Sequence, residues 1–319
     1  MGGDEKAQKR GPQNPIPDSG DARLLSFSLC GIYHKGVELT LGYSPCPNDT
    51  FIFYALAHGL IDTGGLKFRE TLLDVETLNE KALRAELDIT KVSCHAYAYL
   101  KGVGGRGPIS QGLAAPYRLL HSGGAMTKGG GPIVVAREDT GISALRGKKI
   151  AVPGRLTTAY LLLRLYDRAV GESPMEMRFD AVMPAVRDGK AEAGLVIHEG
   201  RFTYRDYGLK CVMDLGKWWQ EETGLPLPLG VIIAKRTLGE GLMEKVDSLI
   251  RESVLYAMKR PDEPMGYIKA HAQELSDDVI RRHIAMYVND YSIDMGADGI
   301  EAVNALTGKA ESLLSGFSS

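Results

Sequence analysis

The sequence predicts an α/β protein in which two lobes enclose a ligand cleft. Three times in its first third, a short strand leads into a loop of small polar residues and then into a helix. This order favours a mostly parallel sheet whose polar loops gather along one edge. The chain then crosses out near Gly131 and returns near Gly230. We therefore expect one lobe from residues 36–131 with 231–319, and a second from residues 132–230.

Composition excludes several classes of function. The chain has 319 residues, of which 44% are hydrophobic, and its formal net charge is -2. Because no basic tract follows a phosphate backbone, nucleic acid is not an expected partner. No apolar run is long enough to cross a bilayer, so no membrane partner is expected. The four cysteines are scattered without metal-ligand spacing, which indicates reduced cytoplasmic thiols and no zinc site.

Residues 1–35 are rich in Gly, Pro, Asp, Lys and Gln, so disorder is the default expectation. The apolar stretch at residues 24–31 is too short for a signal-peptide core. Leu29, directly before Cys30, also fits poorly with a small-residue cleavage site. We therefore expect no export signal here.

The first lobe begins with a strand over residues 37–43, which alternate apolar and polar side chains. Two prolines in residues 44–50 end this strand. Residues 51–60 form an apolar helix that Asn48 or Asp49 can cap. The first amides of that helix then face any anion or carbonyl placed there, although a plain capped turn explains the pattern equally well.

Two further strand–loop–helix units follow. Residues 66–73 form a strand, residues 74–79 an acidic loop, and a helix runs to residue 87. Residues 89–92 form the third strand, which ends at Ser93 before a helical run. Ser93 either donates a hydrogen bond to a ligand or caps that helix. The glycine-rich residues 102–107 and 123–131 match no phosphate-binding loop, and the second stretch is expected to be a flexible approach to the crossing.

In the second lobe, strands are expected at residues 132–137, 149–152, 177–179, 191–197 and 211–215, and helices at residues 159–166 and 185–190. Thr157 and Thr158 lie at the start of the first of these helices. Their hydroxyls and the free amides there either hold a carboxylate or form an ordinary cap. Trp218 and Trp219 either line a pocket for a flat ligand or anchor the core.

His198 follows an apolar strand and precedes Glu199 and Gly200. A histidine at the carboxyl end of a parallel strand lies where open α/β sheets bind their ligands, and it can exchange a proton near neutral pH. The alternative is a surface histidine in a turn. Residues 230–234 then return as a strand to the first sheet, and helices are expected at residues 242–259, 277–288 and 299–314.

Two α/β lobes joined by crossings are the architecture of periplasmic-type binding proteins, which close around small molecules. Four long motifs make the resemblance more specific. They are Ser44-Pro45-Cys46-Pro47-Asn48-Asp49-Thr50-Phe51, Val152-Pro153-Gly154-Arg155 with Thr157-Thr158-Ala159-Tyr160, His198-Glu199-Gly200-Arg201-Phe202-Thr203-Tyr204, and Trp218-Trp219 leading to residues 223–230. In this order they resemble the 1,4-dihydroxy-6-naphthoate synthases of the futalosine route to menaquinone, from about Leu39 to the C-terminus.

The resemblance implies a cytoplasmic lyase with a type II solute-binding-protein fold and no metal or organic cofactor. Its small-molecule substrate is cyclic dehypoxanthine futalosine, and its products are 1,4-dihydroxy-6-naphthoate and a sugar-derived fragment. The family's proton acceptor maps to His198. Substrate contacts map to Lys91, Val92, Ser93, Thr157 and Thr158, with Asp74 and Asn79 in the acidic loop as further contacts.

Two alternatives remain from the sequence. A non-catalytic solute-binding protein has the same fold and needs an export signal, which the leader does not provide. Chorismate dehydratase of the same pathway resembles this family in fold, but the first and third motifs favour the synthase.

Overall fold

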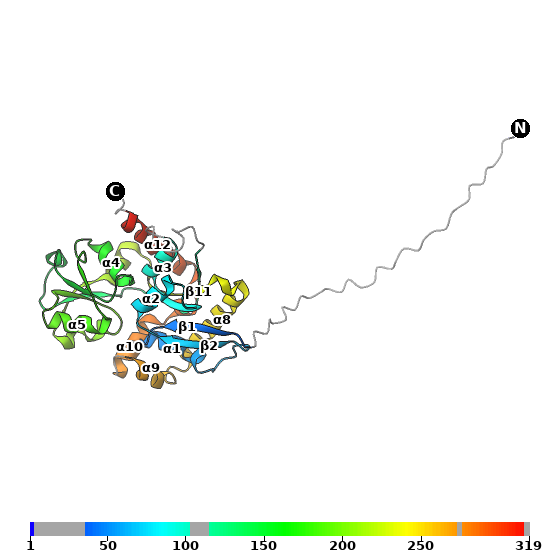
Figure 1. Ribbon diagram of the computed structural model, residues 1–319, viewed down its shortest axis with the longest axis horizontal. Coiled ribbons are helices and arrows are strands. Elements are labelled where there is room, and N and C mark those ends of the chain that lie inside the picture. The colour runs from blue at the N-terminus through cyan, green and yellow to red at the C-terminus, as the bar shows by residue number, and fades with distance from the viewer. Residues whose placement is uncertain (3–35, 103–114, 273–275, 316–319) are drawn as a thin grey trace. The chain divides into compact units, whose positions relative to one another are not determined.

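The computed structural model describes residues 1–2, 36–102, 115–272 and 276–315. The expectations for residues 3–35 and 103–107 lie outside these described residues. The described residues from 36 to 315 belong to one compact unit, which holds two separate β-sheets (Figure 1). Within the described ranges, no helix has the length and apolar character needed to cross a membrane.

The first sheet combines parallel and antiparallel strands. Its strands are β1 (Glu38–Tyr43), β2 (Lys67–Leu72), β3 (Ile89–Ser93), β4 (Tyr117–Leu119), β5 (Ala125–Thr127) and β11 (Leu227–Lys235). Their order is β2-β1-β3-β11-β4, and β5 also pairs with β11. Strand β1 runs parallel to β2 and β3, whereas β11 runs antiparallel to β3, β4 and β5. Every residue of β3 is buried, including the polar Thr90, Lys91 and Ser93, so the strand is covered on both faces.

The second sheet has the same mixed character. Its strands are β6 (Ile133–Ala136), β7 (Ile150–Val152), β8 (Pro174–Glu176), β9 (Ala193–Val196) and β10 (Lys210–Asp214). Their order is β10-β6-β9-β7-β8. Strand β7 is parallel to β8 and β9, and β6 is antiparallel to β9 and β10.

The expectation of mostly parallel sheets is therefore wrong, and the crossings explain why. Strand β6 begins opposite the end of β9, with Ile133 paired to Val196. Strand β11 likewise passes the end of β3, with Gly230 paired to Ser93. A chain that enters a sheet at the carboxyl edge of its parallel strands has to run antiparallel to them. Strand β11 begins at Leu227, before the predicted lobe boundary at residue 231. The division of the chain into two lobes stays our proposal.

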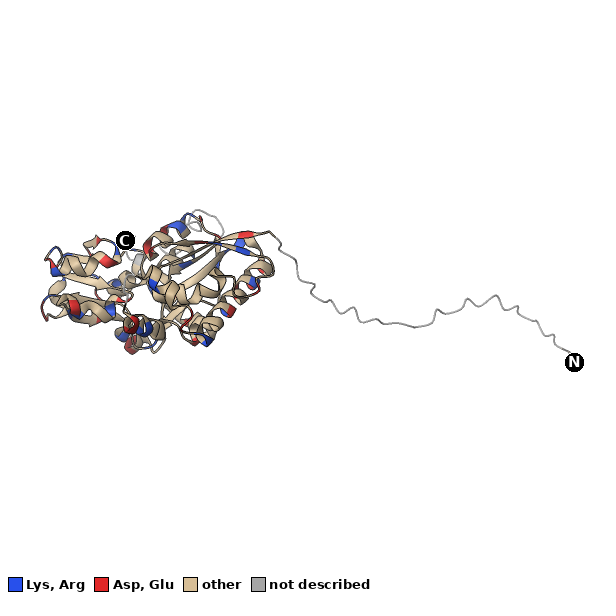
Figure 2. Ribbon diagram, turned by 90° about the horizontal axis from the view of Figure 1, so that it is seen from below, with Lys and Arg blue, Asp and Glu red and all other residues tan. Residues whose placement is uncertain are grey.

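Helices pack on both sheets. Those that follow first-sheet strands are α1 (Pro47–Ala57), α2 (Val75–Leu83), α3 (Cys94–Leu100), η5 (Arg236–Leu238), α8 (Glu240–Lys259), α9 (Met265–His271), α10 (Asp277–Tyr287), α11 (Asp290–Ile293) and α12 (Gly296–Ser315). Those of the second sheet are η3 (Ile142–Leu145), α4 (Thr158–Tyr166), α5 (Phe179–Arg187), α6 (Gly200–Thr203), η4 (Tyr204–Tyr207) and α7 (Leu215–Thr223). Charged residues of both signs are interspersed over these helices (Figure 2).

One apolar cluster runs through both sheets. It joins Val92 and Val231 of the first sheet to Val134 and Leu195 of the second, with helices α3, α4, α7 and α12 contributing side chains. Trp219 is fully buried in it and donates its Nε1 hydrogen to the carbonyl of Pro226 (3.1 Å). The alternative of a core anchor is therefore confirmed for this tryptophan.

Several predicted elements differ from the structure. The strand expected at residues 177–179 lies earlier, at β8, and Phe179 already begins α5. This helix continues through Pro184, because its face of Val182, Met183 and Val186 packs on β9 and the burial offsets the cost of an internal proline. Helix α9 was not expected from the sequence.

The glycine-rich crossing is packed. Gly216, in the first turn of α7, lies against the backbone of Gly130 and Gly131, and a Cβ atom on it would come within 2.2 Å of the Gly130 carbonyl carbon. Strand β5, within residues 123–131, pairs with β11. The expectation of a flexible approach is therefore wrong for this segment, because backbone contacts hold it.

We expect Gly216→Ala to lower the free energy of unfolding by about 2 kcal/mol or more, because backbone atoms cannot move aside for the methyl group. Gly266→Ala is the matched control, since Gly266 is an exposed helical glycine with no atom within 4 Å of its Cβ position. That variant should be about 0.5–1 kcal/mol more stable than wild type. Urea unfolding of both variants checks this, and equal stabilities would show that the crossing is not rigidly packed.

Candidate active site

A cavity of about 670 Å³, counted to its open mouth, lies where both sheets present the carboxyl ends of parallel strands. Its lining comes from both sheets: Ser44, Cys46, Asn48, Asp49, Val75, Leu78, Lys91, Val92, Ser93, Ala125, Pro132, Thr157, Thr158, Ala159, Ile197, His198, Leu229, Gly230, His283 and Tyr287. Six of the eight residues predicted for the site are therefore brought together here.

The turn after β1 builds one wall of the cavity. Helix α1 begins at Pro47, with Cys46 at the N-cap position, so Asn48 and Asp49 lie inside the first turn. The expectation that one of them caps the helix is wrong, because proline at the first helical position sets the start earlier. Both side chains are instead buried and turn toward neighbouring polar groups.

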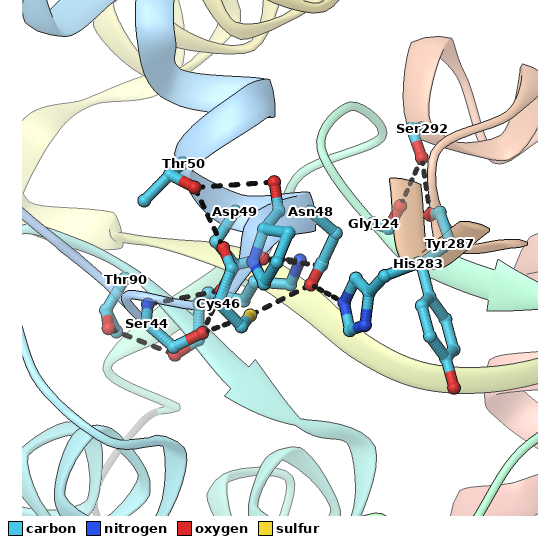
Figure 3. A network of polar contacts seen from close by, with 12 residues as sticks. Ser44, Cys46, Asn48, Asp49, Thr50, Thr90, Gly124, His283, Tyr287 and Ser292 are labelled. Carbon is cyan, nitrogen blue, oxygen red and sulfur yellow. Dashed lines mark hydrogen bonds and ion pairs between the residues drawn. The ribbon is translucent and has the colours of Figure 1, made fainter. Parts of the chain in front are cut away.

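Asp49 is the centre of a buried polar network (Figure 3). Its carboxylate accepts hydrogen bonds from the Ser44 amide (3.1 Å), the Ser44 hydroxyl (2.7 Å) and Asn48 Nδ2 (2.8 Å). It also forms an ion pair with Lys91, which is 6% exposed. These donors replace the water that a buried carboxylate loses.

The network fixes the orientation of Asn48. Since the Asp49 carboxylate only accepts, Asn48 Nδ2 has to face it, and Oδ1 faces the other way. There Oδ1 accepts from Cys46 Sγ (2.8 Å) and lies 2.9 Å from His283 Nε2 (Figure 3). His283 Nε2 therefore carries the hydrogen, which leaves a lone pair on Nδ1.

His198 lies at the end of β9 in an unusual backbone conformation. Its φ is 56°, in the left-handed region that non-glycine residues rarely occupy. This conformation costs on the order of 1 kcal/mol and marks sites where a side chain has to be aimed. The ring packs edge-on against Phe179 (4.9 Å between centroids) and lies 6.4 Å from the ring of His283.

Both imidazoles are neutral at pH 7. Burial lowers the pKa of His198 to about 4, and the nearby Asp49 carboxylate offsets only part of this effect. Burial also lowers the pKa of His283 well below its usual value. For Cys46 the position at a helix start does not produce a reactive thiolate, because burial and the charge of Asp49 raise the pKa of this thiol.

The hydroxyls of Thr157 and Thr158 are used within the protein. Thr157 Oγ1 accepts from the Tyr160 amide (3.2 Å) and donates to the Gly154 carbonyl (2.7 Å), as an N-cap does. Thr158 Oγ1 accepts from the Cys94 amide (2.9 Å) and donates to the Leu229 carbonyl (2.6 Å). The first amides of α4 remain as donors for an anionic group, since no helical partner exists for them.

The remaining predicted residues form a supporting layer. Ser93 Oγ accepts from Asn79 Nδ2 (3.1 Å), and the Ser93 amide donates to Asn79 Oδ1 (2.8 Å). Asp74 caps α2 by accepting from the amides of Glu76 and Thr77. Neither Asn79 nor Asp74 lines the cavity, and their roles as substrate contacts stay predictions.

Glu76 joins the two sheets beside the cavity. Its Oε1 accepts from the amide of Leu156 (2.8 Å), in the loop that leads to α4. The same loop requires glycine at position 154, where φ is 145° and a Cβ atom would lie 2.2 Å from the carboxyl carbon of Glu76. Burial raises the pKa of Glu76 to about 7.

Two cavity residues on α10, His283 and Tyr287, were not predicted from the sequence. The signal was present, because Ile280, His283 and Tyr287 follow the i, i+3, i+7 spacing of a buried helix face. A histidine on such a buried face either has hydrogen-bond partners for its ring nitrogens or takes part in function.

Comparison with known proteins identifies the family of this chain. A family model described as menaquinone biosynthesis matches residues 39–312. The chain is 52% identical over 273 residues to 1,4-dihydroxy-6-naphtoate synthase of Thermus thermophilus, covering 86% of this chain and 94% of that protein. It is 44% identical over 277 residues to the synthase of Streptomyces coelicolor, covering 85% and 92%. The chain belongs to the 1,4-dihydroxy-6-naphthoate synthases of this menaquinone biosynthesis family.

Solved structures confirm the fold. A crystal structure of an Archaeoglobus fulgidus protein is 40% identical with a TM-score of 0.78, covering 88% of this chain and 98% of that one. The alkanesulfonate-binding protein of Xanthomonas axonopodis pv. citri is 14% identical with a TM-score of 0.63, covering 88% and 95%. The predicted periplasmic-binding-protein-like fold of this enzyme is therefore confirmed.

The raised pKa of Glu76 gives a prediction for stability against pH. The folded chain holds the proton between pH 4.5 and about 7, so wild type loses stability as pH rises through this window. Glutamine does not titrate, so the Glu76→Gln variant does not lose stability in this way. The free energy of unfolding of the variant, relative to wild type, should therefore rise by about 2–3 kcal/mol from pH 5 to pH 8.

Urea unfolding at the two pH values measures this difference. Glu80→Gln, an exposed position on the same helix, is the control and should keep a constant offset from wild type. A constant offset for Glu76→Gln as well would show that Glu76 titrates normally.

Proposed function

We propose that this enzyme converts cyclic dehypoxanthine futalosine to 1,4-dihydroxy-6-naphthoate and a sugar-derived fragment, in the cytoplasm, with His198 as general base. The membership of the synthase family supports the overall reaction. The observation that supports the base is the placement of His198: a strained turn holds a neutral imidazole at the cavity, at the carboxyl end of β9.

In this proposal, His198 removes a hydroxyl or carbon-bound proton from the sugar-derived ring. A carbon–carbon bond then breaks in a retro-aldol sense, and aromatisation of the bicyclic product drives the step. Because burial keeps the ring unprotonated at pH 7, the base is present in its active form in nearly every molecule.

The other cavity residues hold the substrate. The amides of Thr158 and Ala159, at the start of α4, bind its carboxylate, which the helix dipole favours. Ser93 faces a carbonyl or hydroxyl group of the substrate, and Lys91 and Val92 line the cavity beside it. Exclusion of water strengthens each of these polar contacts.

Replacement of the base tests the assignment. We expect His198→Asn to lower kcat by about 10²–10⁴-fold, because a positioned base contributes that much. Asparagine is chosen because it tolerates the left-handed backbone of this position. The assay is mass spectrometry of dihydroxynaphthoate formed from cyclic dehypoxanthine futalosine.

His121→Ala, a partly exposed histidine outside the cavity, is the control and should retain full activity. Turnover near wild type in folded His198→Asn would assign the base elsewhere. Binding without turnover in all variants would favour a solute-binding protein, and turnover of chorismate would favour the dehydratase. Fractionation of native cells tests the compartment.

The pH profile gives a second test. Since kcat/KM reports the free enzyme, protonation of His198 should reduce it only below pH 5, toward the pKa of about 4. The unprotonated form is the active one, so kcat/KM should not fall with a midpoint at 6.5, the ordinary value for histidine. Steady-state kinetics from pH 8 to pH 5, over the range in which circular dichroism shows a folded chain, measures this.

A further inference from the structure

Three potential metal ligands meet in the cavity from distant parts of the chain. Cys46 comes from the start of α1, His198 from the end of β9 and His283 from α10. One ligand atom of each, the sulfur and a nitrogen from each ring, lies within 4.8 Å of the other two. We propose that these side chains form a binding site for Zn²⁺ that inhibits the enzyme.

The ligand set selects the metal. Thiolate sulfur and imidazole nitrogen are the ligands that Zn²⁺ prefers, and three protein ligands leave a fourth position for water or a substrate oxygen. Mg²⁺ and Ca²⁺ require oxygen ligands. The nearest carboxylate in the cavity, Asp49, is held by Lys91 and three hydrogen bonds, so it is not available to them.

The distances need only a small adjustment. Zn²⁺ binds sulfur at about 2.3 Å and imidazole nitrogen at about 2.0–2.1 Å, which places tetrahedral ligand atoms about 3.5 Å apart. Side-chain rotations that bring the three atoms about 1 Å closer therefore complete the site. His198 and Cys46 both border the cavity, so a metal ion has a path to them.

The surroundings of His283 resemble those of a metal-bound histidine. A ligating imidazole donates its other ring hydrogen to a fixed acceptor, and His283 lies 2.9 Å from Asn48 Oδ1, which can only accept. Nδ1 of His283 is buried and has no hydrogen-bond partner within the described residues. The Cys46 thiol gives its proton to the buffer as the zinc–sulfur bond forms.

Inhibition follows from the identity of the ligands, and this part depends on the proposed role of His198. A lone pair shared with Zn²⁺ cannot accept a proton from the substrate. Zinc should therefore lower kcat, whereas binding of the metal alone does not depend on any role in catalysis.

Equilibrium dialysis of the untagged full chain with Zn²⁺ tests the site without substrate. We expect one Zn²⁺ per chain, with affinity at least tenfold weaker in Cys46→Ser and in His283→Gln. Cys211→Ser is the control, since this cysteine is exposed and lies outside the cavity. It should bind like wild type, and excess Mg²⁺ should not compete.

Replacement of zinc by Co²⁺ gives a direct readout of the ligands. A thiolate-to-cobalt charge-transfer band should appear in wild type and Cys211→Ser and disappear in Cys46→Ser, with circular dichroism showing that each variant is folded. Equal zinc affinity in all variants, or a band that persists in Cys46→Ser, would overturn the site. Zinc binding at these ligands without inhibition would retain the site and reject the role of His198 as base.

Discussion

The buried ion pair between Asp49 and Lys91 is the interaction on which the cavity depends. Neither side chain can be hydrated, as 2% and 6% of their surfaces are exposed, so each charge requires the other. Removal of one partner from such a pair typically costs about 3–5 kcal/mol. Because the carboxylate also holds Ser44 and Asn48, the pair sets where Cys46 and His283 point. The positions of the Cys46 and His283 side chains therefore depend on the ion pair between Asp49 and Lys91.

Hydrogen bonds between elements of the two sheets hold the cavity residues of the second sheet in place relative to those of the first. The Thr158 hydroxyl, from α4, ties the Cys94 amide to the Leu229 carbonyl, and Glu76 holds the Leu156 amide. An apolar cluster shared by both sheets lies behind these contacts. If the sheets separated and no water entered, these buried donors and acceptors would lose their hydrogen bonds. Each unpaired group would cost about 1–3 kcal/mol. The cavity is therefore a property of the two sheets together.

The sequence was sufficient for the features that local patterns encode. Strand–loop–helix order located β1, β3, β7 and β9, and hence the strand end that carries Ser93 and the loops that carry Thr157 and His198. It could not give strand direction at the crossings, because that depends on which edge the chain enters. Nor could it bring Cys46 beside His283, since these residues are far apart in sequence and meet only through tertiary packing. Asp74 and Asn79 lie next to cavity residues in sequence, and tertiary structure adds that Asp74 caps α2 and Asn79 holds the Ser93 amide.

The distribution of charge also constrains how an anionic substrate can be held. Among the described residues that line the cavity, Lys91 is the only permanent cation, and its charge is already used by Asp49. A carboxylate must therefore rely on backbone amides, and those at the start of α4 are placed for it. Its negative charge would favour the protonated form of a nearby imidazole and so raise the pKa of His198 from about 4 toward neutrality. In the proposed mechanism, the substrate would then make His198 a stronger base, because burial keeps the imidazole neutral beforehand and the bound charge raises its pKa.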